Sequence, residues 1–153
     1  MQQDRWKVYL AGEIHTDWRD QLIQTGKQKD WPIKFVHPQL DHATSDDCGV
    51  RILGEEGSDF WKDHKGSRMN ALRNDTLVKN SDMMVVRFGE KYRQWNAAFD
   101  AGRAQALGIP FVVWHPEEFN HALKEIDSNA HAVCNDFEQV VATLHYACRG
   151  ELA

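Results

Sequence analysis

The chain has 153 residues, of which 42% are hydrophobic and 27% charged, and its formal net charge is -5 at pH 7. This composition is ordinary for a globular protein, and the length predicts one domain over residues 1–153. The acidic balance argues against nucleic acid as a partner, because a phosphate backbone requires a basic surface. No run approaches the roughly 18 apolar residues of a membrane span, so no membrane partner is expected either.

The cysteines and the absence of common binding motifs argue against a disulfide-rich, metal-binding or nucleotide-cofactor protein. Cys48, Cys134 and Cys148 are far apart and show no CxxC spacing, so we expect neither a disulfide framework nor a metal site. Residues 1–5 lack the basic and apolar pattern of a signal peptide, which indicates a cytoplasmic protein. The sequence contains no GxxxxGK[ST], GxGxxG or HExxH motif, and we expect no cofactor.

The hydrophobic pattern predicts alternating strands and helices. Short apolar runs bounded by glycine or proline indicate strands, and apolar residues spaced by three or four indicate helices. The predicted strands are 6–12, 33–37, 83–88, 110–114 and 130–134, and the predicted helices are about 16–29, 59–80, 96–107, 117–125 and 136–148. The polar stretch 38–59 predicts a long loop with one helical turn at 50–53.

This alternation predicts an α/β fold with a parallel sheet covered on both faces. Five strands indicate a flavodoxin-like three-layer sandwich with strand order 2-1-3-4-5. Ligands of such sheets bind at the carboxyl ends of the strands, beside the point where the strand order reverses. Three segments are expected to meet there: residues 12–15, residues 87–96, and His115.

Two carboxylates are predicted to project into that crevice. Asp100 lies in the first turn or so of the predicted helix 96–107, where small residues at 97–102 let a ligand approach. Glu13 follows the first strand. Two carboxylates with separated pKa values can divide the roles of nucleophile and acid. The alternative is two unrelated surface acids, with Asp100 only stabilising the helix dipole.

Aromatic and basic residues flank the same crevice. Trp95 and Phe88 are candidates for stacking on a planar base, and a core or dimer-interface anchor is the alternative for the tryptophan. Arg87, Lys65 and Arg68 are candidates for contact with a phosphate, although a solvated helix face commonly explains such charges. The backbone at Gly12 and Ile14 is expected to contact the ligand directly.

Several runs of the sequence resemble a known family. Residues 9–14, 99–104 and 107–110 resemble the nucleoside 2-deoxyribosyltransferase superfamily, which includes the deoxynucleoside monophosphate N-glycosidases. The runs YLAGEIHTDWR, ILGEE, FWKDHK and VVRFGEKYRQWNAAFDAG resemble the YtoQ family within it, over nearly the whole chain. The resemblance implies a flavodoxin-like fold, a homodimer or higher even homo-oligomer, and cleavage or transfer at an N-glycosidic bond.

The resemblance also implies roles for individual residues. The family's nucleophilic glutamate falls on Asp100, whose side chain is one methylene shorter, so its carboxylate is retracted by about 1.5 Å. The family's ribose-orienting aspartate falls on Asn74, with Asp75 beside it, and its loop acid falls on Gln94. A polar residue lent by the partner subunit falls near His121. Asn74 and Gln94 are therefore neutral where the family is acidic.

Together these observations predict an N-glycosidase or N-glycosyl transferase acting on a nucleoside, nucleotide or related N-ribosyl compound. Asp100 is the expected nucleophile and Glu13 the general acid, base or hydroxyl ligand. The residues expected to hold the sugar are Asn74, Asp75 and Asn96. The alternative is a nucleoside- or nucleotide-binding regulatory protein that has lost catalysis, and a structural dimer without a ligand is a third hypothesis.

Overall fold

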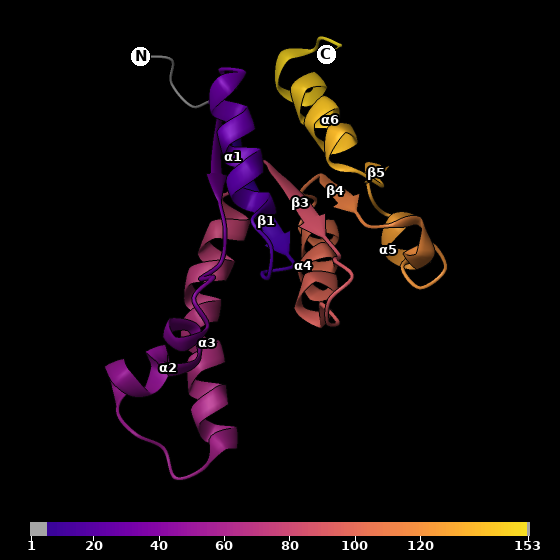
Figure 1. The fold of residues 1–153 in the computed structure, drawn as a ribbon. Helices are drawn as coiled ribbons and strands as arrows, with labels where there is room; N and C mark the ends of the chain where they lie inside the picture. Colours follow the sequence, from indigo (N-terminus) through magenta and orange to yellow (C-terminus); the bar gives the residue numbers. More distant parts are fainter. Residues whose placement is uncertain (1–5, 153) are drawn as a thin grey trace. The chain divides into compact units, whose positions relative to one another are not determined.

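The computed structural model describes residues 6–152, and its strands and helices alternate along the chain (Figure 1). Residues 1–5, on which the expectation of no signal peptide rests, lie outside the described residues. The chain separates into two compact units. One comprises the chain up to Val36 and from Ser81 onward, and the other comprises His37–Asn80. None of the described helices is long and apolar enough to cross a membrane.

The first unit contains a five-stranded parallel sheet. Its strands are β1 (Trp6–Gly12), β2 (Ile33–Val36), β3 (Met83–Arg87), β4 (Phe111–Trp114) and β5 (Ala132–Cys134). The strand order is β2-β1-β3-β4-β5, and every neighbouring pair is parallel, which confirms the predicted topology. The order reverses at β1, which has β2 on one side and β3 on the other.

Helices cover both faces of this sheet. Trp18 and Leu22 of α1 (Trp18–Gln28) and Leu144 of α6 (Phe137–Arg149) share one buried cluster with Val8 and Leu10 of β1. Because side chains alternate along a strand, Tyr9 and Ala11 point to the opposite face. There α4 (Trp95–Ala106) buries its small side chains at 97, 101 and 104. The result is the expected three-layer sandwich.

The second unit corrects the loop predicted for residues 38–59. It pairs α2 (His42–Leu53) with α3 (Asp59–Lys79). Asp41 caps α2 by accepting a hydrogen bond from the Thr44 N–H at 2.9 Å. A Cβ on Gly49 would lie 2.7 Å from the nitrogen of Gly66, so the two helices touch backbone to backbone. The polar sequence of α2 has weak helix propensity, and packing against α3 stabilises it instead.

The helix predicted at 117–125 is also wrong. The segment forms a 3-10 turn at Glu117–Phe119 and then the short helix α5 (Lys124–Asp127). The cause is a tertiary contact of His115, which is fully buried. Its Nε2 lies 2.9 Å from a carboxylate oxygen of Asp127, and its Nδ1 lies 2.7 Å from the carbonyl oxygen of Pro116. These contacts fold the segment back onto the end of β4 and use both ring nitrogens.

Candidate functional site

The carboxyl ends of β1 and β3 meet at Gly12 and Arg87, which are paired in register. Gly12 has φ +113°, and a Cβ there would lie 2.0 Å from the carbonyl oxygen of Arg87. The same oxygen accepts a hydrogen bond from the Glu13 N–H at 3.0 Å. Only glycine allows this close approach with this backbone conformation. The chain therefore turns directly after β1 and places Glu13 beside the end of β3.

Glu13 is held as a buried carboxylate, with its side chain 2% exposed. Its Oε1 accepts hydrogen bonds from the N–H groups of His15 and of Thr16, the latter at 2.8 Å, and its Oε2 accepts one from the Thr16 hydroxyl at 2.6 Å. Burial by itself raises the pKa of Glu13, but these hydrogen bonds and the charge of Arg87 outweigh it and hold the pKa below its usual value. Glu13 is therefore ionised at neutral pH, which suits an acceptor and not a general acid.

Arg87 is built into the edge of the sheet. Its guanidinium carbon lies 4.0 Å from the ring centroid of Trp114 at the end of β4. Its Nη1 donates to the Thr16 hydroxyl at 3.1 Å and lies 3.7 Å from a carboxylate oxygen of Glu13. These contacts occupy one face and one end of the guanidinium. Arg87 thus joins the segments after β1, β3 and β4, and this role competes with the predicted contact to a phosphate.

Asp100 lies in the second turn of α4 and not in the first, because the helix already begins at Trp95. Its side chain is 16% exposed, and one of its oxygens lies 3.5 Å from Nη1 of Arg103. Its charge also acts on buried Arg19, as does the charge of Glu13. The two predicted carboxylates are thus both within electrostatic reach of one guanidinium in the same unit.

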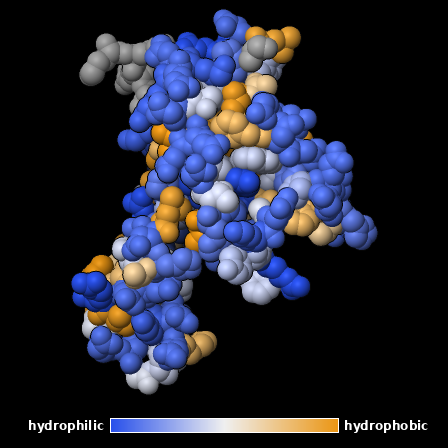
Figure 2. All heavy atoms as spheres, in the orientation of Figure 1, coloured by the Kyte–Doolittle hydropathy of each residue, from blue (hydrophilic) through white to orange (hydrophobic). Residues whose placement is uncertain are grey.

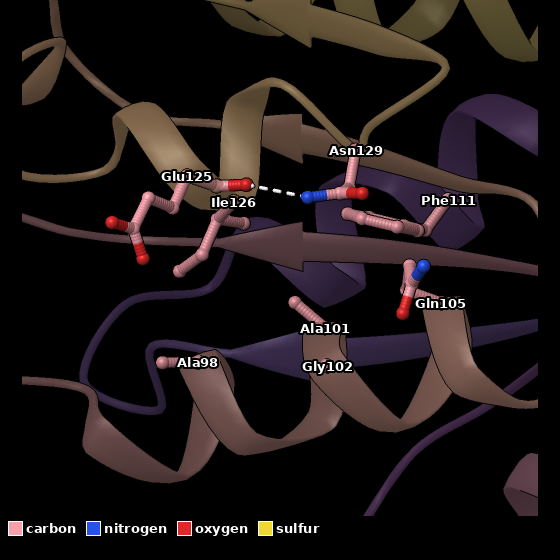
Figure 3. A pocket seen from close by; sticks show the side chains of 8 residues that line it. All are labelled: Ala98, Ala101, Gly102, Gln105, Phe111, Glu125, Ile126 and Asn129. Atoms are coloured by element: carbon pink, nitrogen blue, oxygen red, sulfur yellow. Dashed lines mark hydrogen bonds between the residues drawn. The ribbon is translucent and has the colours of Figure 1, made fainter.

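The small residues of α4 face a different direction from the one expected. Ala98, Ala101 and Gly102 line a hollow of about 140 Å³ between α4 and α5, together with Phe111 of β4 (Figure 3). Asp100 does not line this hollow. Figure 3 shows these short side chains opposite Ile126 of α5. Their small volume lets α5 pack on α4, so it is not evidence for a cavity at Asp100.

Gln94 organises the loop after β3. Its side-chain oxygen accepts a hydrogen bond from the Gly89 N–H at 3.1 Å, and its amide nitrogen donates to the carbonyl oxygens of Lys91 and Tyr92 at 2.6 and 2.8 Å. Tyr92 has φ +62°, and its ring lies 4.6 Å from the ring of His15. The Gln94 amide is therefore engaged in holding the loop, which competes with the predicted contact to substrate.

The remaining predicted residues of this unit differ in exposure. Trp95 is 73% exposed at the start of α4, and Asn96 beside it is also exposed. Ile14 is at the border of exposure, and His121 lies on an exposed turn before α5. Phe88 is only 5% exposed, so its ring belongs to the interior and does not favour stacking on a base. Trp95 remains available for that role.

Asn74 and Asp75 belong to the other unit, on α3. The side-chain oxygen of Asn74 is buried, and the described residues offer it no hydrogen-bond partner. A buried acceptor without a donor destabilises a protein by about 1–3 kcal/mol, so native structures rarely keep one without a reason. Asp75 is half-buried next to Asn74.

The basic residues of α3 are largely paired within their own unit. Lys62 lies 3.0 Å from a carboxylate oxygen of Asp47. Lys65 forms an ion pair with Glu56 at 2.5 Å and donates to the carbonyl oxygen of Gly54 at 2.8 Å. These contacts support the solvated-face interpretation of the lysines.

Several apolar side chains of the unit are nevertheless exposed, and Figure 2 shows hydrophobic surface among hydrophilic surface over α2 and α3.

Metal binding has no support in residues 6–152, where no group of three or more His, Cys, Asp or Glu side chains is arranged to hold an ion. Asp41, in the polar stretch before α2, caps that helix. All three cysteines are free thiols. For Cys134 and Cys148, burial raises the pKa of the thiol, which makes both less reactive.

Sequence reasoning missed three residues that shape the site. Thr16 donates twice to Glu13, Tyr92 contacts His15, and Arg19 lies buried behind the Glu13 segment. A threonine three residues after an acid is a turn pattern that predicts the first contact. No pattern in one sequence predicts the other two, because their partners lie on separate segments.

The fold defines an α/β protein with a parallel sheet. Its ligand site is expected at the carboxyl ends of β1 and β3, where the strand order reverses. Residues 9–148 match the family model described as nucleoside 2-deoxyribosyltransferase YtoQ. The chain is 40% identical over 139 residues to the uncharacterized protein YtoQ of Bacillus subtilis (strain 168), covering 91% of this chain and 94% of that one. The chain therefore belongs to the YtoQ family of nucleoside 2-deoxyribosyltransferase-like proteins.

Solved structures with the same fold include more distant relatives. A 2-deoxyribosyltransferase of Bacillus psychrosaccharolyticus is 21% identical with a TM-score of 0.58, over 90% of this chain and 95% of that chain. A conserved protein of Enterococcus faecalis V583 is 19% identical with a TM-score of 0.64, over 93% and 98% of the two chains. At these identities the likeness establishes the fold alone.

Proposed function

We propose that this protein cleaves or transfers at the N-glycosidic bond of a nucleoside, nucleotide or related N-ribosyl compound. The observation that carries the proposal is Asp100, a largely buried carboxylate at the position of the family's nucleophile, next to the guanidinium of Arg103. Family membership over residues 9–148 supports the substrate class. A reducing compartment would keep the three thiols free, so we propose that the enzyme is cytoplasmic, and the proposed reaction uses no cofactor.

In the proposed reaction a carboxylate oxygen of Asp100 attacks the anomeric carbon of the sugar. The bond from that carbon to the base nitrogen breaks through an oxocarbenium-like transition state, and the base leaves with the bonding electron pair and takes up a proton. Water or an acceptor base then attacks the anomeric carbon and loses a proton to solvent, and the bond from that carbon to Asp100 breaks, with the electron pair returning to the carboxylate. Nη1 of Arg103 lies 3.5 Å from a carboxylate oxygen of Asp100 and is proposed to orient this carboxylate.

Glu13 takes a supporting part in this proposal. Because it is ionised and accepts three hydrogen bonds from residues 15 and 16, it orders the segment after β1, and Oε2 keeps capacity to accept one more hydrogen bond. We assign that capacity to a sugar hydroxyl. The proton taken up by the base then comes from solvent and not from Glu13.

The proposed contacts of the protein with the sugar and with the base rest on the family resemblance and on the exposure of individual side chains. Asn74 and Asp75 of α3 remain proposed contacts to the sugar, on the family resemblance alone. The exposed ring of Trp95 supports stacking on a base, and the exposed Asn96 supports a polar contact. Gly12 and Ile14 remain proposed backbone contacts. His121 is proposed to act from a partner subunit in a homodimer or higher even oligomer.

One observation favours a second candidate function, ligand binding without catalysis. Gln94 stands where the family has an acid, and its amide is engaged within its own loop. The proposed site therefore lacks the loop acid that the family resemblance implies at this position. We would expect a neutral glutamine at this position in a protein that still binds its ligand at the carboxyl end of the sheet but no longer catalyses the reaction.

A ligand screen followed by a base-release assay tests the proposal. Nucleosides, nucleotides and N-ribosyl compounds are first screened by thermal shift, since a ligand at 100 times its Kd stabilises the folded state by about 2.7 kcal/mol. Each hit is then assayed for release of its base. We expect Asp100→Asn to bind the hit and lose about a thousandfold or more in kcat. Binding without turnover in the native protein would instead establish the second function.

A further inference from the structure

Arg19, near the start of α1, is a buried cation with three hydrogen bonds to one short stretch of main chain. The residue is 3% exposed. Its Nε donates to the carbonyl oxygen of Leu10 at 3.1 Å, its Nη2 to that of Gly12 at 3.1 Å, and its Nη1 to that of Glu13 at 2.6 Å. The guanidinium also lies 4.6 Å from the ring centroid of Trp18.

The lengths of the strands explain why these carbonyl groups need a donor. β1 pairs with β2 only from Trp6 to Tyr9, whereas it pairs with β3 as far as Gly12. Successive main-chain groups of a strand point alternately to its two neighbours. The carbonyl groups of Leu10 and Gly12 point to the side where β2 has ended. Beyond the end of β2, the guanidinium of Arg19 donates the hydrogen bonds that these two carbonyl groups would otherwise accept from a neighbouring strand.

The charge of Arg19 is balanced by the candidate site. Burial lowers the pKa of Arg19 to about 10, so it stays cationic at neutral pH. The carboxylates of Glu13 and Asp100 and the phenol of Tyr9 raise the pKa of Arg19 and so oppose the effect of burial. The cation of Arg87 lowers this pKa further. A buried charge is tolerated where opposite charges and hydrogen bonds compensate it.

We propose that Arg19 is a positioning residue of the candidate site. It holds the main chain from Leu10 to Glu13 in the conformation in which Glu13 reaches the N–H groups of His15 and Thr16, and its charge stabilises the ionised Glu13. The inference deepens the proposed function, which uses Glu13. It does not depend on turnover, because both effects exist in the protein without substrate.

Two substitutions separate the hydrogen bonds of Arg19 from its charge. Arg19→Lys keeps the charge and loses the fork that spans three carbonyl groups, and Arg19→Met loses both. Trp18→Phe is the matched control. It removes another donor to the carbonyl oxygen of Glu13, the indole N–H at 2.7 Å, and keeps an aromatic ring beside the Arg19 guanidinium.

The test is NMR of the folded protein without ligand, with carboxyl carbons labelled in glutamate. We expect Arg19→Met to move the Glu13 titration midpoint to higher pH, while Arg19→Lys and Trp18→Phe leave it near the native value. We expect the amide protons of His15 and Thr16 to exchange about tenfold faster in both Arg19 variants and not in Trp18→Phe.

Two results would overturn the inference. One is a native Glu13 midpoint in folded Arg19→Met. The other is native exchange at His15 and Thr16 in Arg19→Lys, which decides the matter if Arg19→Met does not fold. Neither readout involves a substrate. Absence of base release, or an active Asp100→Asn, would therefore refute the proposed function and leave the role of Arg19 standing.

Discussion

Thr16 and Glu13 form a closed hydrogen-bonded turn in which the threonine donates both its N–H, at 2.8 Å, and its hydroxyl, at 2.6 Å, to one carboxylate. The turn lies directly after β1, where the main-chain path is already constrained by Gly12. It therefore couples the ionisation of Glu13 to the shape of the predicted ligand edge. Its strength can be measured without knowing the ligand.

Thr16→Val is expected to destabilise the protein by about 1.5–3 kcal/mol, because it leaves the charged Oε2 of Glu13 without its hydroxyl donor. Urea unfolding at pH 7 measures the change. Thr25→Val is the matched control, since the Thr25 hydroxyl donates to the Gln21 carbonyl oxygen within α1. Its expected cost is below about 1 kcal/mol. Equal losses in the two variants would contradict a special role for the turn.

Stability is expected to fall in acid because of Glu13. The pKa of Glu13 is lower in the folded protein than its ordinary value of 4.5, so the unfolded chain takes up the proton first as the pH falls. This contribution is complete above pH 4.5 and is lost as the pH falls through the folded pKa. Urea midpoints measured between pH 7 and pH 3 should show it. Glu13→Gln should lower the midpoint at pH 7 and flatten the decline, and an unchanged decline would refute the assignment.

Gly12→Ala is expected to cost at least about 4 kcal/mol or to prevent folding, because the new Cβ would overlap the carbonyl oxygen of Arg87. Gly54→Ala separates this overlap from backbone strain. Gly54 also has a positive φ, of +98°, but nothing lies within 4 Å of its Cβ position. That variant should cost about 1–3 kcal/mol. Chemical unfolding of both gives the difference, and similar costs would show that strain alone matters.

Lengthening the carboxylate of Asp100 tests whether the site is built for aspartate. Asp100→Glu restores the side chain of the family's nucleophile but advances the carboxylate by about 1.5 Å. We expect the rate of base release to fall about 100-fold, as for other misplacements of about 1 Å. Asp20→Glu on the exposed face of α1 is the control and should leave the rate unchanged. A faster Asp100→Glu enzyme would show that the pocket kept the geometry suited to glutamate.

The proposed oligomer is tested by light scattering coupled to size exclusion. We expect a mass of two chains or a higher even number, since the exposed apolar side chains of α2 and α3 offer area to bury. A single-chain mass across a wide range of concentrations would refute the oligomer. It would also remove the basis for placing His121 in a neighbouring site.

The strand order could be predicted because each buried strand is a short apolar run and the helices α1, α4 and α6 between or after the strands each have one apolar face. Such patterns depend on local spacing, which one sequence displays. α2 was missed because most of its residues from His42 to Gly49 are polar and poor helix formers, and no local pattern shows the contact of Gly49 with Gly66. The place of Asp100 was predicted only to within one turn, because helix starts are set by capping and tertiary contacts.

The sequence by itself determined the alternation of strands and helices, the parallel sheet and the family, since these follow from local hydrophobic spacing and from runs of matching residues. Only the tertiary structure decided what the polar groups at the edge of the sheet do. Arg87 is joined to Trp114 and to Thr16, and Arg19 completes the end of β1. The physical reason is that a hydrogen bond or ion pair depends on the distance between atoms, and residues far apart in the chain acquire that distance only when the sheet forms.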